Sequence, residues 1–229
     1  MKISIIHPSR SRAKMAYETA HKWLDNSEDN FEYILSLDYD DRTEYKNPFT
    51  DGIVIRNKNR SAIDAINNAA KVASGDILIV VSDDFDCPIH WDEMIINGSE
   101  GKSDWIAKTP DGIQQWIITM PIMDRAYYNR FRYIYHPDYL HMFCDTELTC
   151  VADLTGRKIE LNIPFTHNHY STGKSVKDEV SIKADATWNQ GENLFIERAK
   201  INFGLVNPPG KIKSMEYINW MKNKGVLVR

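Results

Sequence analysis

Three carboxylate side chains, Asp83, Asp84 and Asp86, follow directly on the apolar run 77–81. An unbroken apolar run of this kind is typical of a strand that is buried on both faces, in the middle of a parallel sheet. The carboxyl end of such a strand is where open α/β sheets bind their ligands. Crowded carboxylates repel one another unless they share a cation, and oxygen ligands favour Mg²⁺, Mn²⁺ or Ca²⁺. The pattern indicates a metal site, with the alternative that Asp86 is only a turn residue or helix N-cap.

A second polar group lies in the turn 8–12, between an expected strand at 2–7, which Pro8 should break, and an expected helix at 14–25. Backbone N–H groups at such a helix start, together with hydroxyl and guanidinium groups, suit the phosphates or base of a nucleotide. The alternative is a capped helix with solvated arginines. The candidate side chains are Pro8, Ser9, Arg10 and Arg12.

Asp38 follows a second expected strand, 31–37, and could accept hydrogen bonds from a ribose or a base, although it could equally be a loop acid. Asp145 and Glu147 lie among apolar residues at the start of an expected helix that Gly156 ends. There a carboxylate is either a helix cap or, with its pKa raised by apolar neighbours, a general base. His167 and His169 alternate on an extended stretch and so share one face, as metal ligands or as structural histidines.

Alternating strands and helices up to residue 81 predict an α/β fold: a mostly parallel sheet with helices on both faces. We expect residues 103–122 to add a hairpin at the sheet edge, turning at 110–112, and 123–132 to form a helix with Asp124 and Arg125 exposed. A further strand is expected at 158–164. The remaining prediction is one domain over 1–176 with a helical C-terminal extension over 177–229, containing helices at 178–203 and 214–224.

Composition excludes several classes of protein. A net charge of −4 and a pI near 6.0 argue against general nucleic-acid binding. No apolar run approaches the roughly 20 residues of a membrane-spanning helix, and the first residues are expected to form a strand and not a signal peptide. The 3 cysteines lack metal-site spacing, which fits a cytoplasmic protein. Neither a G-x-G-x-x-G fingerprint nor a P-loop is present, which argues against dehydrogenases and P-loop NTPases.

Several of these motifs, in this order, resemble the GT-A glycosyltransferases of the family-2-like group. The resemblance runs from residue 2 to about 170, with Pro8-Ser9 after the first strand, Asp38 after the second, the helix segments 65–69 and 73–76, and Ser82-Asp83-Asp84 after the apolar run. One departure is that Ser82 replaces the first acid of the family's Asp-x-Asp motif if Asp84 is its last member. If Asp84-Phe85-Asp86 is the motif, the frame moves by two, so the acid that binds metal directly stays open.

The resemblance implies a GT-A fold and a Mn²⁺ or Mg²⁺ ion on a nucleotide-sugar diphosphate. It implies metal ligation by Asp84 or Asp86, with His167 or His169 as a further ligand, and a catalytic base at Asp145, with Glu147 second. The implied nucleotide-binding residues are Pro8, Ser9, Arg10, Arg12, Asp38, Arg60, Asn67 and Asp83.

The resulting prediction is an inverting, hexosyltransferase-type enzyme that moves a sugar from a nucleotide donor, a UDP-sugar first, to a hydroxyl acceptor on a glycan or another molecule. Three alternatives stay open. A sugar-1-phosphate nucleotidylyltransferase has a similar fold, but its Gly-rich loop after the first strand is missing. A metal-dependent hydrolase would use the same acids on water. A non-catalytic protein on this fold would bind nucleotide or carbohydrate without turnover.

Overall fold

The computed structural model describes residues 1–28, 30–45 and 52–225. Its centre is a seven-stranded sheet in the order β3-β2-β1-β4-β7-β6-β8, with a separate two-stranded ribbon of β5 and β9. The strands of the sheet are β1 (Ile3–Ser9), β2 (Phe31–Asp38), β3 (Ile53–Asn57), β4 (Ile77–Val80), β6 (Ile106–Lys108), β7 (Ile122–Asp124) and β8 (Lys158–Glu160). The ribbon pairs β5 (Phe85–Asp86) with β9 (Thr166–His167).

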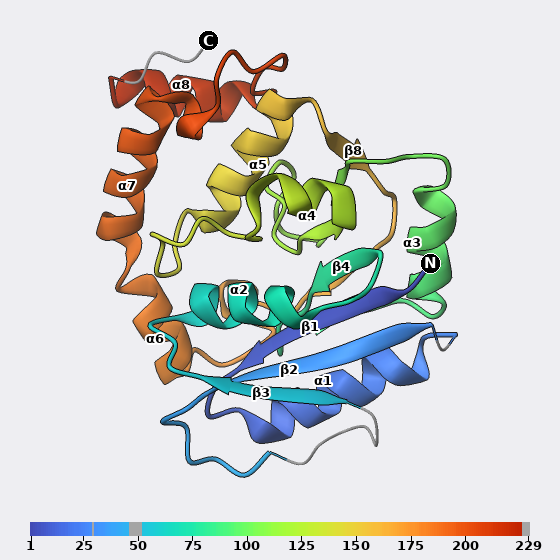
Figure 1. Ribbon diagram of the computed structural model, residues 1–229. Helices are drawn as coiled ribbons and strands as arrows, with labels where there is room; N and C mark the ends of the chain where they lie inside the picture. Colours follow the sequence, from blue (N-terminus) through green and yellow to red (C-terminus); the bar gives the residue numbers. More distant parts are fainter. Residues whose placement is uncertain (29, 46–51, 226–229) are drawn as a thin grey trace.

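The sheet is mostly parallel, as predicted. Strand β1 pairs in parallel with β2 and β4, β2 pairs in parallel with β3, and β6 with β8, whereas β7 runs antiparallel to β4 and β6. All four residues of β4 are buried, which explains the unbroken apolar run. Strands β1, β2 and β4 therefore end at one edge of the sheet, on the left of Figure 1.

Helices cover both faces of this sheet, because alternate residues of a strand point to opposite faces. Ile3 and Ile5 of β1 pack with Trp23 and Trp91 on one face of the sheet. Ile6 belongs to the apolar cluster on the other face, with Ile63 and Leu148. Figure 1 shows α1 on one side of β1–β3 and α2 on the other. The helices are α1 (Ala13–Asp25), α2 (Ala62–Val72), α3 (Trp91–Gly98), α4 (Arg125–Phe131), α5 (Cys144–Thr155), α6 (Glu179–Asp185), α7 (Trp188–Lys200) and α8 (Met215–Asn223), with 3-10 turns at Tyr170–Thr172 and Asn202–Gly204.

The C-terminal helices share the core of the preceding domain. Phe195 of α7, Phe203 and Met221 of α8 are buried in the same apolar cluster as Leu148 of α5 and Ile6 of β1. Helices α6 and α7 lie as a column along one side of the molecule, and α8 lies across its top (Figure 1). Within the described residues, no helix combines the length and the apolar character that crossing a bilayer requires.

Four local predictions differ from the structure. Strand β1 continues through Pro8 to Ser9. Proline is tolerated there because pairing with β4 ends at Ile6, so no strand on that side needs a hydrogen bond from an N–H at position 8. Strands β6 and β7 lie inside the sheet, with β8 at its edge, and the chain between them runs from 109 to 121 without a tight hairpin turn. Strand β8 ends at Glu160, four residues before the expected end.

The helix expected at 123–132 starts later because its first residues have other roles. Met123 belongs to β7, and the Asp124 side chain caps α4 by accepting a hydrogen bond from the Tyr127 N–H at 2.8 Å. Arg125 is not free in solvent: its guanidinium donates to the carbonyls of Gly75 and Ala73. These contacts tie α4 to the turn that leads into β4.

Candidate active site

Asp83 joins the ends of β4 and β1. Its side chain is 3% exposed, its Oδ1 lies 2.9 Å from His7 Nε2, and its Oδ2 accepts a hydrogen bond from Ser9 Oγ at 3.2 Å. His7 Nδ1 contacts the Tyr33 hydroxyl, and the Thr19 hydroxyl donates to the Asp83 carbonyl. The Asp83 carboxylate therefore fixes the position of Ser9, the residue expected beside the nucleotide.

Arg10 and Asp38 form a charged group at the ends of β1 and β2. Arg10 Nη1 donates to Asp38 at 2.5 Å and to Asp40 at 2.7 Å, and Asn59 donates to the second oxygen of Asp38 at 2.8 Å. The hydrogen bonds that Arg10 donates to Asp40 and Asp38 raise the pKa of its guanidinium, so its charge is constant at ordinary pH. Sequence reasoning placed both residues at the nucleotide, and the structure brings them together.

Arg12 reaches in the other direction, to the start of α6. Its Nε and Nη2 donate to the two carboxylate oxygens of Asp178 at 2.7 and 2.6 Å, and its Nη1 lies 3.8 Å from Asp83 Oδ2. Asp178 also caps α6 by accepting from the Ser181 N–H. The hydrogen bond from Arg12 lowers the pKa of Asp178, the largest of several effects. Arg12 thus links the turn after β1 to the C-terminal segment.

Asp84 faces His167 across the turn between β4 and β5. Its Oδ2 lies 3.2 Å from His167 Nε2, and its Oδ1 accepts from Ser82 Oγ at 2.5 Å. Burial raises the pKa of Asp84, but the hydrogen bonds from His167 and Ser82 and the His167 charge outweigh it and lower that pKa to about 2. The His167 ring stacks on Phe85 at 4.2 Å, and its Nδ1 is buried with no partner among the described residues.

Of the other two candidate metal ligands, Asp86 is paired elsewhere and His169 lies beside His167. Asp86 forms an ion pair with Lys22 of α1 at 2.5 Å. The ring of His169 lies 5.0 Å from that of His167, and its Nδ1 contacts Ser171. Over residues 1–28, 30–45 and 52–225, no group of three or more His, Cys, Asp or Glu side chains is arranged to hold a metal by itself. Asp84 and His167 would supply two ligands, which suits Mg²⁺ or Mn²⁺ completed by phosphate oxygens and water.

Asp145 lies in the first turn of α5, after a strained residue. Phe143 has φ of 71° in the left-handed region, which bulky residues rarely adopt. Asp145 Oδ1 accepts from the Thr146 N–H at 2.7 Å and the Thr146 hydroxyl at 3.2 Å. Its side chain stays partly exposed. Burial raises the pKa of Asp145, while the Thr146 N–H and the charge of His141 lower it in part. This carboxyl has the features of a general base.

His141 is a residue that sequence reasoning missed. Its side chain is exposed, and its carbonyl accepts a hydrogen bond from the Cys144 N–H at 3.4 Å, at the start of α5. Its position four residues before Asp145 was the only signal in the sequence.

Glu147 occupies a different environment from Asp145. It is 3% exposed, and Arg198 of α7 donates to both of its oxygens at 2.7 to 2.9 Å, while the Tyr139 hydroxyl donates at 2.8 Å. The carboxylate is therefore fully engaged in a buried ion pair between α5 and α7.

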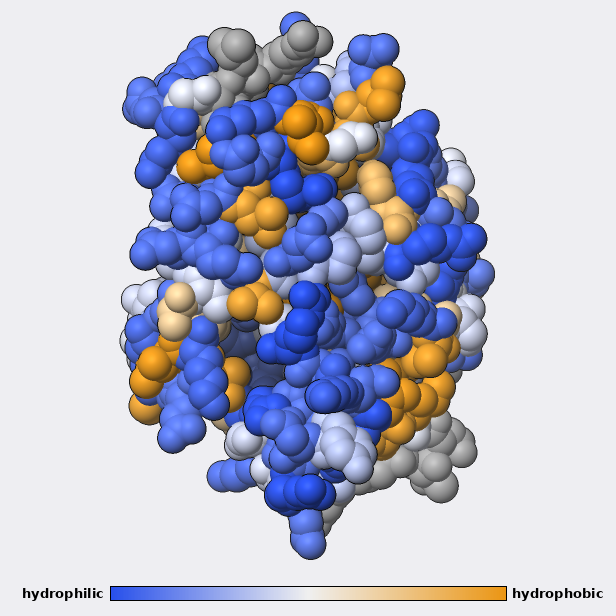
Figure 2. All heavy atoms as spheres, turned by 60° about the vertical axis from the view of Figure 1, so that its left-hand side comes forward, coloured by the Kyte–Doolittle hydropathy of each residue, from blue (hydrophilic) through white to orange (hydrophobic). Residues whose placement is uncertain are grey.

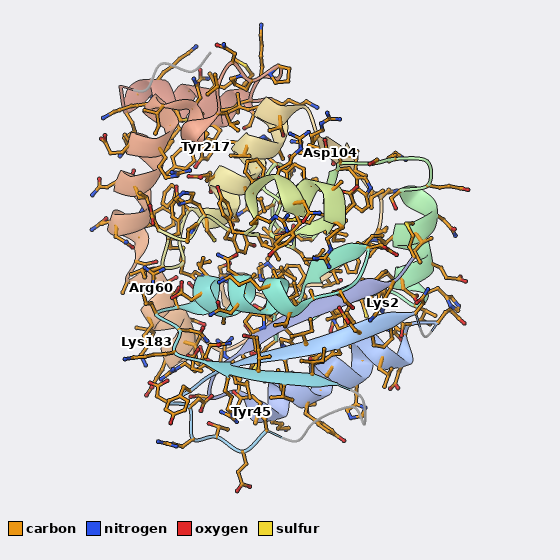
Figure 3. All side chains as sticks on the ribbon, in the orientation of Figure 1. Lys2, Tyr45, Arg60, Asp104, Lys183 and Tyr217 are labelled. Carbon is orange, nitrogen blue, oxygen red and sulfur yellow. The ribbon has the colours of Figure 1, made fainter. Side chains whose placement is uncertain are left out.

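Arg60 and Asn67 lie at the loop 133–139 and not among the strand-end residues. Arg60 pairs with Asp64 and donates to the Pro137 carbonyl at 2.7 Å. The buried Asn67 side chain accepts from the Ile134 N–H and donates to the Tyr135 carbonyl. Figure 3 shows Arg60 at the amino end of α2, whereas Tyr45 lies on the far side of β3, in the loop after β2.

A pocket of about 560 Å³ opens beside the end of β2, next to Arg10 and Asp38. Seven side chains line it: Tyr39, Asp41, Arg42, Thr43, Glu44, Tyr45 and Arg56. Burial raises the pKa of Asp41, but hydrogen bonds from the N–H groups of Ser11 and Thr43 and from Tyr45 lower it to about 2. The pocket therefore presents an ionised carboxylate and aromatic rings.

Comparison with solved structures supports the fold. The crystal structure of S. aureus TarS matches with a TM-score of 0.59 at 14% sequence identity, covering 90% of this chain and 41% of that one. The chain therefore spans less than half the length of TarS. No curated protein sequence matches.

The family comparison covers most of the chain. The family model described as "Glycosyl transferase family 2" matches residues 4–172. That range contains both groups of strand-end residues, the Asp84–His167 pair and Asp145. The expected GT-A fold and the expected family are confirmed, and the chain belongs to glycosyl transferase family 2.

Proposed function

We propose that this glycosyltransferase moves a sugar from a UDP-sugar to a hydroxyl acceptor, with inversion and with Mn²⁺ or Mg²⁺. One observation carries the proposal: Asp84, just after the central strand of a family-2 fold, pairs with His167, and Asp145 lies in the first turn of α5. Burial raises the pKa of Asp145. The Asp84–His167 pair suits the metal of a leaving diphosphate, and the Asp145 carboxylate suits an attacking hydroxyl.

The nucleotide would lie across the ends of β1 and β2. Ser9, held by Asp83, and the guanidinium groups of Arg10 and Arg12 are donors suited to phosphate and ribose oxygens. The pocket lined by Tyr39, Asp41 and Tyr45 is large enough for a pyrimidine base. A carboxylate there would accept a hydrogen bond from an N–H of the base.

Asp84 and His167 would hold the divalent metal, with Asp84 ionised throughout the physiological range. When bound, the metal supplies Lewis-acid stabilisation of the negative charge on the departing diphosphate. Asp86 is assigned to the contact with Lys22 and not to the metal.

Asp145 would take the proton of the acceptor hydroxyl as its oxygen bonds to the anomeric carbon. The bond from that carbon to the diphosphate oxygen breaks in the same step, and the electron pair leaves with UDP. Attack from the face opposite the leaving group inverts the anomeric configuration. Thr146 holds one oxygen of Asp145, which leaves the other to face the acceptor.

Thermal unfolding with Mn²⁺ and a panel of UDP, GDP, CDP and dTDP tests the donor site, because a ligand of the native state raises its stability. We expect a metal-dependent shift with UDP that Asp84→Ala abolishes and the matched variant Asp86→Ala retains. Loss of the shift in Asp86→Ala alone would overturn the metal assignment, and no shift with any nucleotide would overturn the donor site.

Asp145→Asn tests the chemical step. We expect it to keep the UDP shift and to lose transfer by a factor of about 10² to 10⁴, the usual contribution of a general base. Transfer at the wild-type rate would remove Asp145 from the mechanism. Nucleotide binding without turnover in the wild-type protein, across UDP-sugars, would indicate a binding protein instead.

A further inference from the structure

The first turn of α7 is fixed on the loop that leads to Asp145. The Met142 N–H donates to Thr187 Oγ1 at 3.1 Å. A Cβ at Gly191 would lie 2.3 Å from the Met142 carbonyl oxygen, so only glycine permits α7 to approach this closely. The start of α7 and the loop before Asp145 therefore form one rigid unit.

Trp188 projects from this unit with part of its indole in solvent. Its ring meets that of Phe143 edge to face, with centroids 5.1 Å apart, and it is 53% exposed. Phe143 is two residues before Asp145 and is itself held in a left-handed conformation. A large aromatic side chain is thus packed on one side and open on the other, beside the candidate base.

Polar groups surround the same place. His141 is exposed and precedes Met142, which is bonded to Thr187 at the start of α7, and its carbonyl accepts a hydrogen bond from the Cys144 N–H at 3.4 Å. Figure 2 shows the face on which α6 and α7 lie: it is largely hydrophilic, with scattered apolar side chains and a recess in its lower half. Such a face does not resemble an apolar docking surface for a lipid chain or an obligate protein partner.

We propose, on the basis of the proposed function, that Trp188 and His141 form the acceptor subsite and that the acceptor is a saccharide. A sugar ring has an apolar C–H face and a rim of hydroxyl groups. The open side of the indole would pack against that face, and His141 would bond to a hydroxyl on the rim. The ring would then present another hydroxyl to Asp145.

This subsite depends on a part of the chain that the family match does not reach. The matched range ends at residue 172, whereas Trp188 and the α7 turn that carries it lie beyond it. Acceptor choice would accordingly be set by α7, and donor binding by the strand ends of the matched region.

The test is saccharide binding by the full chain in the presence of UDP and Mn²⁺. The probe is an array of oligosaccharides built from glucose, galactose, N-acetylglucosamine, mannose and rhamnose. We expect at least one class to bind, and Trp188→Ala to weaken its affinity about tenfold, the upper range for an aromatic contact. Trp188→Phe should retain most of the affinity. Ile201→Ala, an exposed apolar residue just after the far end of α7, is the matched control and should change nothing.

The outcomes separate this inference from the proposed function. No stability shift of the wild-type protein with UDP and Mn²⁺ would overturn the proposed function. A UDP shift without binding of any saccharide on the array would refute the acceptor inference alone. Equal saccharide affinity in the wild type and Trp188→Ala would also refute it and leave the donor site standing. Circular dichroism of each variant shows whether it is folded. If Trp188→Ala is not folded, the saccharide affinity of Trp188→Phe is compared with that of the wild type instead.

Discussion

Replacing Glu147 should lower the stability of the fold before it affects chemistry. Glu147 lies in α5 next to the candidate base, but its carboxylate accepts hydrogen bonds from Arg198 and from the Tyr139 hydroxyl. The side chains of Glu147 and Arg198 are 4% and 15% exposed. We expect Glu147→Ala to unfold at a lower temperature and to reduce activity only through the loss of folded protein.

The magnitude follows from what the substitution leaves behind. Without Glu147, the Arg198 guanidinium keeps only the Phe203 carbonyl, at 3.2 Å, among the partners seen in the described residues. Removing one partner of a buried ion pair costs about 3–5 kcal/mol of unfolding free energy. For a domain of this size, each kcal/mol shifts the melting temperature by about 2–4 °C, so the loss is roughly 6–20 °C.

Differential scanning calorimetry of a double-mutant cycle measures this effect. Glu147→Leu and Arg198→Met should each destabilise strongly, while the double variant should recover much of the loss, because no uncompensated buried charge remains. A melting temperature of Glu147→Ala within about 2 °C of the wild type, together with lost transfer, would refute the reasoning and return Glu147 to the catalytic candidates.

Two further predictions concern charges at and near the site. Asp178→Asn should strengthen UDP binding in Mn²⁺ about two- to fivefold, because Arg12 no longer pairs with a carboxylate while asparagine still caps α6. Isothermal titration calorimetry measures the affinity, with Asp185→Asn as the control variant. Weaker UDP binding by Asp178→Asn would show that Asp178 positions Arg12. Burial raises the pKa of Glu32, but bonds from Lys2, Ser4 and Ser74 lower it to about 2 from the usual 4.5. The stabilisation that these bonds give the folded state should be complete above pH 4.5 and lost as the pH falls towards 2. The free energies of urea unfolding of the wild type and Glu32→Gln should therefore converge at low pH, and a constant difference would contradict this linkage.

Residues at strand ends could be predicted to lie together from the sequence alone. Ser9 and Asp38 end β1 and β2, Asp83 comes just after β4, and parallel strands that are neighbours in a sheet end at the same edge. The order of apolar runs and turn residues was sufficient to expect this. The extension of β1 through Pro8 was not, because it depends on where pairing with β4 stops.

Helical residues could not be placed in the same way, because their partners are distant in the chain. Glu147 bonds to Arg198, which is 51 residues away, and Arg60 bonds to the Pro137 carbonyl, 77 residues away. A carboxylate in a first helical turn looks the same in sequence whether it faces a substrate or a buried arginine. Likewise, the pairing of β5 with β9 sets Asp84 against His167, and no local pattern reveals that pairing.

The C-terminal segment connects the two halves of the candidate site. Asp178 pairs with Arg12 of the turn after β1, while Thr187 and Gly191 hold the loop before Asp145. A movement of α6 and α7 would therefore change the donor side and the acceptor side together. A diphosphate that takes the Arg12 guanidinium would break its ion pair with Asp178 and so loosen the start of α6. Helix α7 would follow through the short connection at 186–187, so donor binding and the position of Trp188 would be energetically coupled.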